Sequence, residues 1–202
     1  MDKTAIIILA AGKSSRFGRP KQTLFYNGKS LLQHVADEAL KATLHPVVII
    51  TGANEEKVLE KIDPSGLTIV HNEFWDEGMA TGISKGIDKL ENMEVIKSVI
   101  ISVCDQPFLS SDILRQLIDK KQHTGKGIIA AAYAGTVGVP VLFDKKYFKA
   151  LKELEKGEGA KKLIHLFPED LASIDFQAGS IDIDTEEDYN LLLDQSSEGS
   201  LQ

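Results

Sequence analysis

A small, polar and basic loop follows the first apolar run of the chain. Residues 6–9 are four branched apolar residues, residues 10–12 read AAG, and residues 13–22 read KSSRFGRPKQ. A strand buried on both faces has a continuous hydrophobic sequence, and ligands in open α/β sheets lie where such strands end. Small residues let backbone N–H groups approach a phosphate closely, and Arg16 and Lys21 add positive charge. The sequence therefore predicts a triphosphate-binding loop.

This loop differs from the two best-known phosphate-binding designs. It contains neither G-x-x-x-x-G-K-[ST] nor G-x-G-x-x-G. The alternative interpretation is a Gly-rich turn between a strand and a helix that binds nothing. The presence of Arg16 and Lys21 in one loop favours phosphate binding over that alternative.

Two aspartates follow apolar segments elsewhere in the chain. Asp105 comes after the apolar residues 99–103, and Asp184 comes after residues 181–183. The carboxyl ends of parallel strands meet at one edge of a sheet, so both carboxylates are expected beside the phosphate-binding loop. Carboxylate oxygens suit Mg²⁺, which shares its ligands with substrate phosphates. We therefore expect Asp105 and Asp184 to hold one Mg²⁺; the alternative for Asp105 is a turn before Pro107.

Two further stretches suit contacts with ligands. Residues 71–79 precede a predicted helix and could bring backbone groups to a base or ribose; the alternative is a surface turn with Trp75 packed. Residues 157–161 form a Gly-rich turn at another helix start. Lys161 and Lys162 there would suit an anionic second substrate, whereas the alternative is a helix-capping turn with solvated lysines.

These residues need a scaffold in which strands and helices alternate. Apolar runs predict strands at 6–9, 47–50, 67–70, 98–103, 127–132 and 139–143, and two short strands at 171–176 and 180–183 that could pair antiparallel. Helical spacing predicts helices at 31–40, 55–61, 79–90, 112–121, 145–154, 160–167 and 185–193. This alternation is typical of βαβ units and a mainly parallel sheet.

Composition is that of a single-domain globular protein. The chain has 202 residues, of which 43% are hydrophobic and 26% charged, enough for a sizeable core. We expect one domain with two lobes over residues 1–195 and a flexible tail at 196–202. A net charge of −7 argues against a nucleic-acid partner, and no apolar run is long enough to span a membrane. Cys104 is the only cysteine, so no intramolecular disulfide is possible, and we expect a cytoplasmic location.

Several motifs together resemble nucleotidyltransferases built on a Rossmann-like sheet. The string L-A-A-G-x-S-x-R-x-G-x-P-K at residues 9–21 resembles their signature. Five motifs occur in an order that resembles the molybdenum cofactor cytidylyltransferase branch of the MobA-like NTP transferases. They are this string, D-Q-P at 105–107, G-x-P-x-x-F at 138–143, the Gly-rich turn at 157–161 and D-I-D-T-x-x-D at 182–188. Three positions, Gly82, Val139 and Glu158, depart from that branch.

The resemblance implies a fold and a set of site residues. The fold is an α/β, Rossmann-like three-layer sandwich with a mainly parallel central sheet, of the nucleotide-diphospho-sugar transferase type. The implied catalytic residues are Arg16, Lys21 and Asp105, and the implied metal ligands are Asp105 and Asp184. The expected nucleotide-binding residues are Leu9, Ala10, Ala11, Gly12, Ser14, Ser15, Arg16, Lys21, Thr51, Gly52, Asn72, Gly78 and Met79. The expected acceptor-binding residues are Gly138, Pro140, Gly159 and Lys161.

The resemblance also implies a reaction. It is the Mg²⁺-dependent transfer of CMP from CTP to molybdopterin, with release of pyrophosphate; a molybdoenzyme or its maturation chaperone is a possible partner. Ala11 and the Pro20-Lys21 pair resemble cytidylyl-type members, whereas guanylyl-type members tend to have L-A-G-G and D-K, so CTP is favoured over GTP. Two alternatives stay open: a sugar phosphate or an alditol phosphate as acceptor, and a non-catalytic nucleotide-binding partner of molybdoenzymes.

Overall fold

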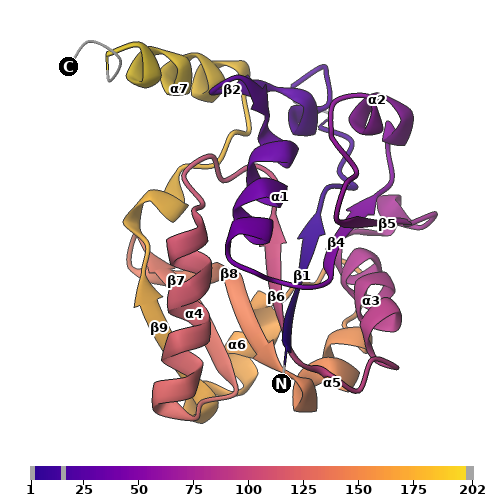
Figure 1. Ribbon diagram of the computed structural model, residues 1–202, viewed down its shortest axis with the longest axis vertical. Coiled ribbons are helices and arrows are strands. Elements are labelled where there is room, and N and C mark those ends of the chain that lie inside the picture. The colour runs from indigo at the N-terminus through magenta and orange to yellow at the C-terminus, as the bar shows by residue number, and fades with distance from the viewer. Residues whose placement is uncertain (1–2, 15–16, 199–202) are drawn as a thin grey trace.

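A seven-stranded sheet forms the centre of the protein (Figure 1). The computed structural model describes residues 3–14 and 17–198, and the side chains up to residue 194. The strand order is β5-β4-β1-β6-β8-β7-β9. The strands are β1 (Lys3–Leu9), β4 (Val47–Thr51), β5 (Leu67–His71), β6 (Ile96–Val103), β7 (Ile128–Tyr133), β8 (Thr136–Asp144) and β9 (Leu171–Asp175).

The sheet is mainly parallel, as the sequence predicts. β1 pairs in parallel with β4 and β6, β4 with β5, and β7 with β9. β8 runs antiparallel to both β6 and β7, because the tight turn at Ala134 and Gly135, both with positive φ, reverses the chain after β7. The carboxyl ends of β1, β4, β5 and β6 therefore lie at one edge of the sheet.

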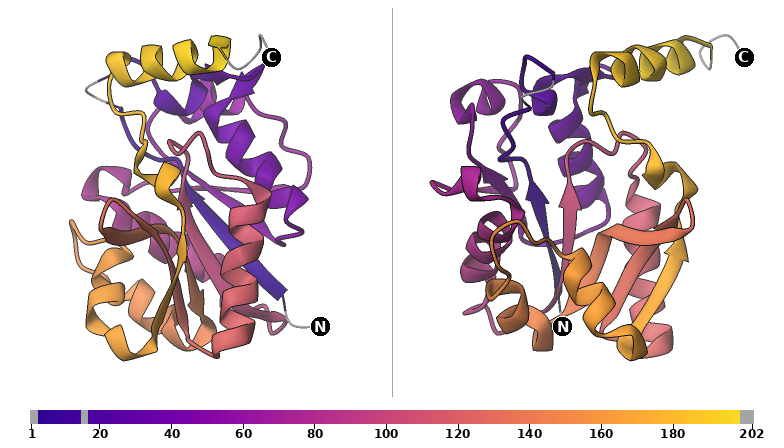
Figure 2. Two further views of the ribbon diagram at one scale, coloured as in Figure 1. Left: turned by 90° about the vertical axis from the view of Figure 1, so that its left-hand side faces the viewer. Right: turned by 180° about the vertical axis from the view of Figure 1, so that it is seen from behind.

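Helices cover both faces of the sheet and complete three layers. The helices α1 (Leu31–Lys41), α2 (Glu55–Leu59) and α4 (Ser111–Thr124) pack on one face, and α3 (Met79–Leu90), α5 (Phe148–Lys152) and α6 (Lys161–Leu166) pack on the other. Figure 2 shows the sheet between α4 and the pair α5 and α6. Side chains alternate along a strand, so Ile6 and Ile8 join one core while Ile7 joins the other. This two-sided burial explains the continuous apolar run of β1.

A third, smaller cluster joins the N-terminal half to the last helix. It contains Phe17, Leu24 and Tyr26 from the N-terminal half and Ile183, Tyr189 and Leu192 from the C-terminal end. The hairpin of β2 (Phe25–Tyr26) and β3 (Lys29–Ser30) lies beside α7 (Glu186–Glu198), which crosses the top of the molecule in Figure 1. Five short 3-10 helices complete the described chain: η1 (Lys21–Thr23), η2 (Trp75–Glu77), η3 (Lys145–Tyr147), η4 (Pro168–Asp170) and η5 (Gln177–Ser180).

The C-terminal region differs most from the sequence-based expectation. Residues 180–183 form no strand, and β9 pairs in parallel with β7, so the expected antiparallel pairing is wrong. Ile183 turns instead into the third cluster, and its N–H donates to the Asp105 carbonyl oxygen at 3.2 Å. The last helix continues beyond residue 193 to Glu198, so part of the expected tail is helical, while residues 199–202 lie outside the described chain. No helix in the described chain is long and apolar enough to cross a membrane.

Asp170 joins three segments at the amino ends of β7 and β9. Its carboxylate accepts hydrogen bonds from the Gly127 N–H (3.0 Å) and the Tyr147 hydroxyl (2.6 Å), and it pairs with Lys146 Nζ at 2.7 Å. Burial alone would raise the pKa of Asp170, but the contacts with Lys146, Tyr147 and Gly127 outweigh it and lower the pKa from 3.8 to about 2. The charged carboxylate therefore stabilises the native state.

We expect Asp170→Asn to lower the free energy of unfolding by about 1–3 kcal/mol at neutral pH, because a charged acceptor of three hydrogen bonds is lost. The contribution is fully present above pH 3.8 and disappears as the pH falls through about 2, because Asp170 is then protonated in both states. Urea unfolding of both proteins between pH 2 and 7 measures this difference. A difference that stays constant down to pH 2 would contradict the assignment.

Candidate functional site

A cavity opens where β1 and β6 end. This central cavity has a volume of about 230 Å³. Its lining comes from the ends of both strands, the loop after β1, and the turn between β5 and α3. The lining residues are Leu9, Ala10, Ala11, Gly12, Lys21, Gln22, Asn72, Trp75, Gly78, Met79, Gly82, Val103, Cys104 and Asp105. The cavity thus lies at the sheet edge where the sequence predicts ligand binding.

The loop after β1 is held closed by a buried glutamine. Gln22, 1% exposed, donates from Nε2 to the carbonyl oxygens of Ala10 (2.8 Å) and Gly12 (2.9 Å). The Ser14 hydroxyl accepts from the Lys21 N–H at 3.1 Å and joins the two ends of the loop. Among the described residues, no acceptor takes the N–H groups of Gly12 and Lys13. These donors are available to an anion.

Gln22 is a site residue that the sequence-based selection missed. Its position next to Lys21 in the motif is the only signal in the sequence. The predicted residues Ser15 and Arg16 lie outside the described residues.

Lys21 brings Asp105 and Asp184 together. Its ammonium group donates to the Asp105 carboxylate and, at 2.9 Å, to Oδ1 of Asp184. The side chains of Lys21 and Asp105 are mostly buried, whereas that of Asp184 is 46% exposed. Asp105 follows β6, and Asp184 follows the segment whose Ile183 N–H donates to the Asp105 carbonyl oxygen. The two carboxylates therefore meet at one point, through a backbone contact and a shared cation.

A capping box fixes the segment that carries Asp184. The Asp188 carboxylate accepts from the N–H groups of Asp184 (3.1 Å) and Thr185 (2.8 Å), and the Thr185 hydroxyl accepts from the Asp188 N–H at 3.2 Å. This reciprocal pattern satisfies the free N–H groups at the start of α7. Asp188 thus holds the backbone of Asp184 and Thr185 in place.

Several acidic side chains of the described chain lie around Lys21. Burial alone would lower the pKa of Lys21, but Asp105 and Asp184 outweigh it and raise that pKa above its usual value. Burial, then Asp105 and Asp184, raise the pKa of Asp182. Burial raises the pKa of the Cys104 thiol to about 12, so this cysteine is a buried thiol rather than a nucleophile. Among the described residues, the Lys21 ammonium group contacts two of these carboxylates, Asp105 and Asp184.

The donor set fits a hard divalent cation that also binds phosphate. Asp105 and Asp184 present carboxylate oxygens to the same point. No group of three or more His, Cys, Asp or Glu side chains in the described chain could hold a metal without further ligands. Mg²⁺ is typically held by one or two carboxylates together with water and substrate phosphates. The residues present therefore fit a metal that binds together with a polyphosphate.

The turn between β5 and α3 forms one wall of the central cavity. Asn72, fully buried, donates from Nδ2 to the Thr81 hydroxyl at 2.9 Å and accepts from the Phe74 N–H at 3.2 Å. Its side chain therefore shapes the turn. Gly78, with a φ of 108°, and Met79 at the start of α3 line the cavity directly.

Thr51 and Gly52 stand behind the central cavity. The Thr51 hydroxyl donates to Glu55 at 2.6 Å, and Gly52 packs against Trp75 and Ala11. Neither residue is part of the cavity lining, although the sequence predicts both as nucleotide-binding. They support the residues that line it.

A second, lateral cavity of about 220 Å³ adjoins the central one. The two share Leu9, Met79 and Val103. The predicted acceptor-binding residues Gly138, Gly159 and Lys161 line the lateral cavity, and Pro140 is buried in β8 without lining it. The remaining lining residues are Ile83, Ile101, Tyr133, Thr136, Val137, Val139 and Ala160.

The two lysines at the start of α6 differ in their surroundings. Lys161 Nζ donates to the Thr136 hydroxyl at 3.1 Å, beside the lateral cavity. Lys162 pairs with Glu158 at 2.5 Å. Only the first of the two predicted cations therefore faces the cavity.

An outer, polar cavity of about 650 Å³ lies on the other side of the loop. Lys13, Arg19, Lys57 and Trp75 are among its lining residues. Arg19 pairs with Glu186 at 2.8 Å, whereas Lys13 and Lys57 form no ion pair with the described residues. No motif or spacing in the sequence points to Lys57 as a site residue. Both free ammonium groups could bind an anion that reaches past the loop.

Two known proteins are similar to this chain over most of their length. The chain is 30% identical over 198 residues to nicotine blue oxidoreductase from Paenarthrobacter nicotinovorans, covering 92% of this chain and 95% of that protein. It is 27% identical over 204 residues to the purine catabolism protein PucB of Bacillus subtilis, covering 92% and 94%.

A solved structure of similar fold is that of Rv0371c from Mycobacterium tuberculosis. It has a TM-score of 0.83 and 26% identity, over 96% of this chain and 98% of that one. The same protein is also known in complex with manganese, with a TM-score of 0.77 and 24% identity over 96% of this chain and 98% of that one. These neighbours have the nucleotide-diphospho-sugar transferase type of fold.

The family match covers most of the chain. Residues 6–173 match the family described as the MobA-like NTP transferase domain. This range includes most of β1, the loop after β1, Asp105 and the residues that line the lateral cavity. The chain belongs to the MobA-like NTP transferase family.

Proposed function

We propose that this protein transfers CMP from CTP to molybdopterin, with Mg²⁺, and releases pyrophosphate. The observation that carries the proposal is the meeting of Lys21, Asp105 and Asp184 beside a loop with free N–H groups. This arrangement offers cations, amide donors and metal-binding oxygens at one place, which are the groups that a nucleoside triphosphate needs. A molybdoenzyme or its maturation chaperone would receive the product.

The proposed reaction needs positioning and charge neutralisation rather than a protein nucleophile. An oxygen of the acceptor phosphate forms a bond to the α-phosphorus of CTP, while the bond to the bridging oxygen breaks and its electron pair leaves with pyrophosphate. Lys21 neutralises the phosphate at which attack occurs, and the Gly12 and Lys13 amides orient the leaving group. Lys13 and Lys57 lie where the outer phosphates would extend.

Asp105 and Asp184 are the residues that would hold the metal. When bound, Mg²⁺ neutralises charge that develops on the phosphates during the transfer. Manganese in the complex of the related mycobacterial protein supports a divalent cation in this family. Ionised phosphate needs no general base, so the buried Cys104 thiol has no step to perform.

The preference for CTP rests on small residues around the central cavity. Ala11 and the Pro20-Lys21 pair resemble cytidylyl-type members, and Gly82 adds no side chain to the wall beside Leu9. A pyrimidine needs less room than a purine, and the cavity volume is only about 230 Å³. The lateral cavity takes the acceptor, because it adjoins the central cavity and carries Lys161.

CTP with Mg²⁺ is expected to raise the melting temperature more than GTP with Mg²⁺, because ligand binding stabilises the native state. Pyrophosphate release from CTP should require molybdopterin. One relative has an oxidoreductase name, so the assay must follow pyrophosphate directly. Equal or better stabilisation by GTP would reverse the nucleotide assignment. Pyrophosphate release with a sugar phosphate or an alditol phosphate instead would replace the acceptor, and CTP binding without release would indicate a non-catalytic protein.

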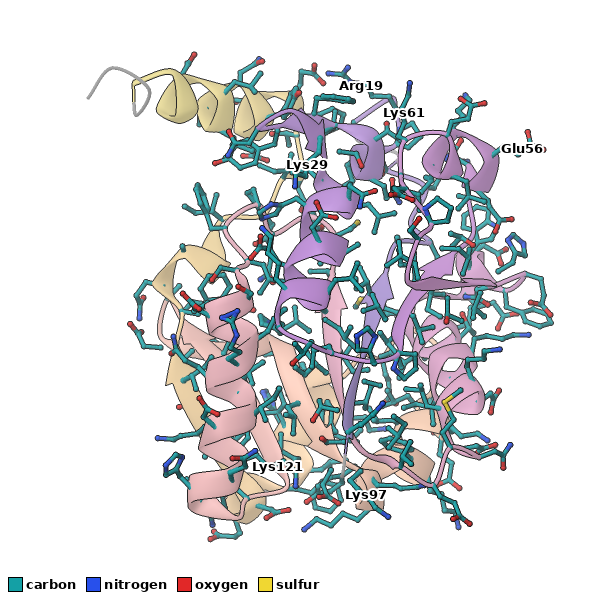
Figure 3. All side chains as sticks on the ribbon, in the orientation of Figure 1. Arg19, Lys29, Glu56, Lys61, Lys97 and Lys121 are labelled. Carbon is teal, nitrogen blue, oxygen red and sulfur yellow. The ribbon has the colours of Figure 1, made fainter. Side chains whose placement is uncertain are left out.

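Lys21→Ala should weaken CTP binding in the presence of Mg²⁺ by about 10- to 150-fold, because a hydrogen bond to a charged group contributes about 1.5–3 kcal/mol. Isothermal titration calorimetry measures the affinity. The matched control is Lys97→Ala, since this exposed lysine lies at the opposite end of the molecule from α7 and Arg19 (Figure 3). Wild-type affinity in Lys21→Ala would remove this lysine from the phosphate site.

Asp105→Asn should abolish pyrophosphate release while the protein stays folded, because the amide cannot supply a charged metal ligand. Metal-independent CTP binding should persist, since Lys21 and the loop amides remain. Pyrophosphate assays with Mg²⁺ in excess over CTP, together with circular dichroism, test the first statement. Calorimetric titration with CTP in the absence of Mg²⁺ tests the second. Asp119→Asn on the exposed side of α4 is the control. Turnover close to wild type in Asp105→Asn would exclude the proposed metal role.

A further inference from the structure

Gln106 connects the Asp105 segment to β8 and η5. Its side chain is 2% exposed, and Nε2 donates to the carbonyl oxygens of Gly179 (2.9 Å) and Val139 (3.2 Å). Its Oε1 is buried and has no hydrogen-bond partner among the described residues. The amide also lies beside the hydroxyl of Tyr133. A buried amide oxygen without a partner among the described residues makes a contact with a hydrogen-bond donor favourable in this corner.

Two glycines fix the ring of Tyr133 in this corner. A Cβ atom at Gly138 would lie 2.3 Å from the Tyr133 hydroxyl oxygen and 3.2 Å from Cζ. A Cβ atom at Gly179 would lie 2.9 Å from Cδ1 of the same ring. Any larger residue at either position would displace the ring, so the place of the hydroxyl depends on both glycines. Gly138 is one of the predicted acceptor-binding residues, and the structure gives it this reason to lack a side chain.

Tyr133 lines the lateral cavity on the side nearest the acidic cluster. Burial, then the carboxylates of Asp182 and Asp105, raise the pKa of Tyr133, so the hydroxyl keeps its proton at neutral pH. It can therefore donate to an anion. Most other side chains of the lining are aliphatic, and Lys161 and Thr136 supply the remaining polar groups. The cavity therefore suits an apolar group that carries an anionic group.

We propose that the Tyr133 hydroxyl donates a hydrogen bond to the attacking phosphate of the acceptor and holds it toward the Lys21 and Asp105 site. This inference rests on the proposed function, in which the lateral cavity takes the acceptor. Tyr133 supplies no proton to the reaction and only positions the phosphate. The acceptor class is then a phosphate monoester of an apolar group, with the apolar part against the aliphatic lining and the phosphate at the junction of the two cavities.

Phenyl phosphate is a probe with both features of this class. Its affinity is measured by isothermal titration calorimetry with Mg²⁺, in the presence and absence of a CTP analogue with a methylene bridge between the α and β phosphorus atoms. Tyr133→Phe keeps the ring and removes the hydroxyl, so it should weaken phenyl phosphate binding by about 10- to 150-fold, the range for a hydrogen bond to a charged group. Binding of the CTP analogue should not change.

Tyr147→Phe is the matched control. It removes a hydroxyl that donates to Asp170 at 2.6 Å, away from both cavities, so it should lower the melting temperature without weakening phenyl phosphate binding.

Gly138→Ala provides a second variant, because its Cβ would displace the Tyr133 hydroxyl. It should weaken binding in the wild type and have a much smaller effect in Tyr133→Phe, since the displaced atom is then absent.

Each outcome decides for or against the role of Tyr133. Equal affinity in Tyr133→Phe and wild type, an equal loss in Tyr147→Phe, or no phenyl phosphate binding by the wild type overturns it. The proposed function fails separately. If CTP and molybdopterin give no pyrophosphate while phenyl phosphate binding still depends on Tyr133, the cavity assignment stands and the reaction is a different one.

Discussion

The contact of one ammonium group with two carboxylates is the interaction on which the candidate site depends. Lys21 lies 84 residues from Asp105 and 163 residues from Asp184 along the chain, so three distant segments meet at its Nζ atom. Two carboxylates this close would repel each other without a cation. Lys21 supplies that cation, and burial together with Asp105 and Asp184 raises the pKa of Asp182 beside them. In the proposed function, the carboxylates of Asp105 and Asp184 also hold a metal cation that binds with its own anionic ligand.

Two buried glutamines support this contact from opposite sides. Gln22 donates to the carbonyl oxygens of Ala10 and Gly12 and holds the loop that carries Lys21. Gln106 donates to Val139 and Gly179 and holds the segment that carries Asp105 against β8 and η5. A buried amide is costly unless it is hydrogen-bonded, so both side chains fix the backbone that they contact. The two glutamines thereby hold in place backbone segments that line the central and the lateral cavity.

The parts of this structure that sequence reasoning predicts well are those with a strong local pattern. The apolar runs of β1, β4 and β6 are buried on both faces, and α3 has the predicted bounds Met79–Leu90. The alternation of Ile181, Asp182 and Ile183 also has a strand pattern, but it arises because Ile183 enters the cluster around Tyr189 while Ile181 is 40% exposed. Local periodicity does not distinguish a strand from an extended segment that crosses the end of a sheet.

The site contacts could not be predicted from the sequence for a related reason. The motif places Lys21 and the two aspartates at the same sheet edge, yet their mutual ion pairs depend on how the segment before α7 folds back onto Asp105. The contact of Thr51 also depends on tertiary packing. This residue ends β4 at the same sheet edge, but its hydroxyl donates to Glu55 instead of facing the cavity. Residue type and strand position thus predict the neighbourhood of a side chain, whereas its partner is decided by tertiary packing.

The two adjoining cavities divide recognition between charge and shape. The central cavity joins Lys21, Asp105 and the amides of the loop after β1, and in the proposed function it binds the polyphosphate. The lateral cavity is lined largely by aliphatic side chains, among them Val139. An apolar wall contributes affinity without orientation. Orientation of a bound molecule must then come from the few polar groups of the lining, and this is why we assign a positioning role to the hydroxyl of Tyr133, whose ring lies between Gly138 and Gly179.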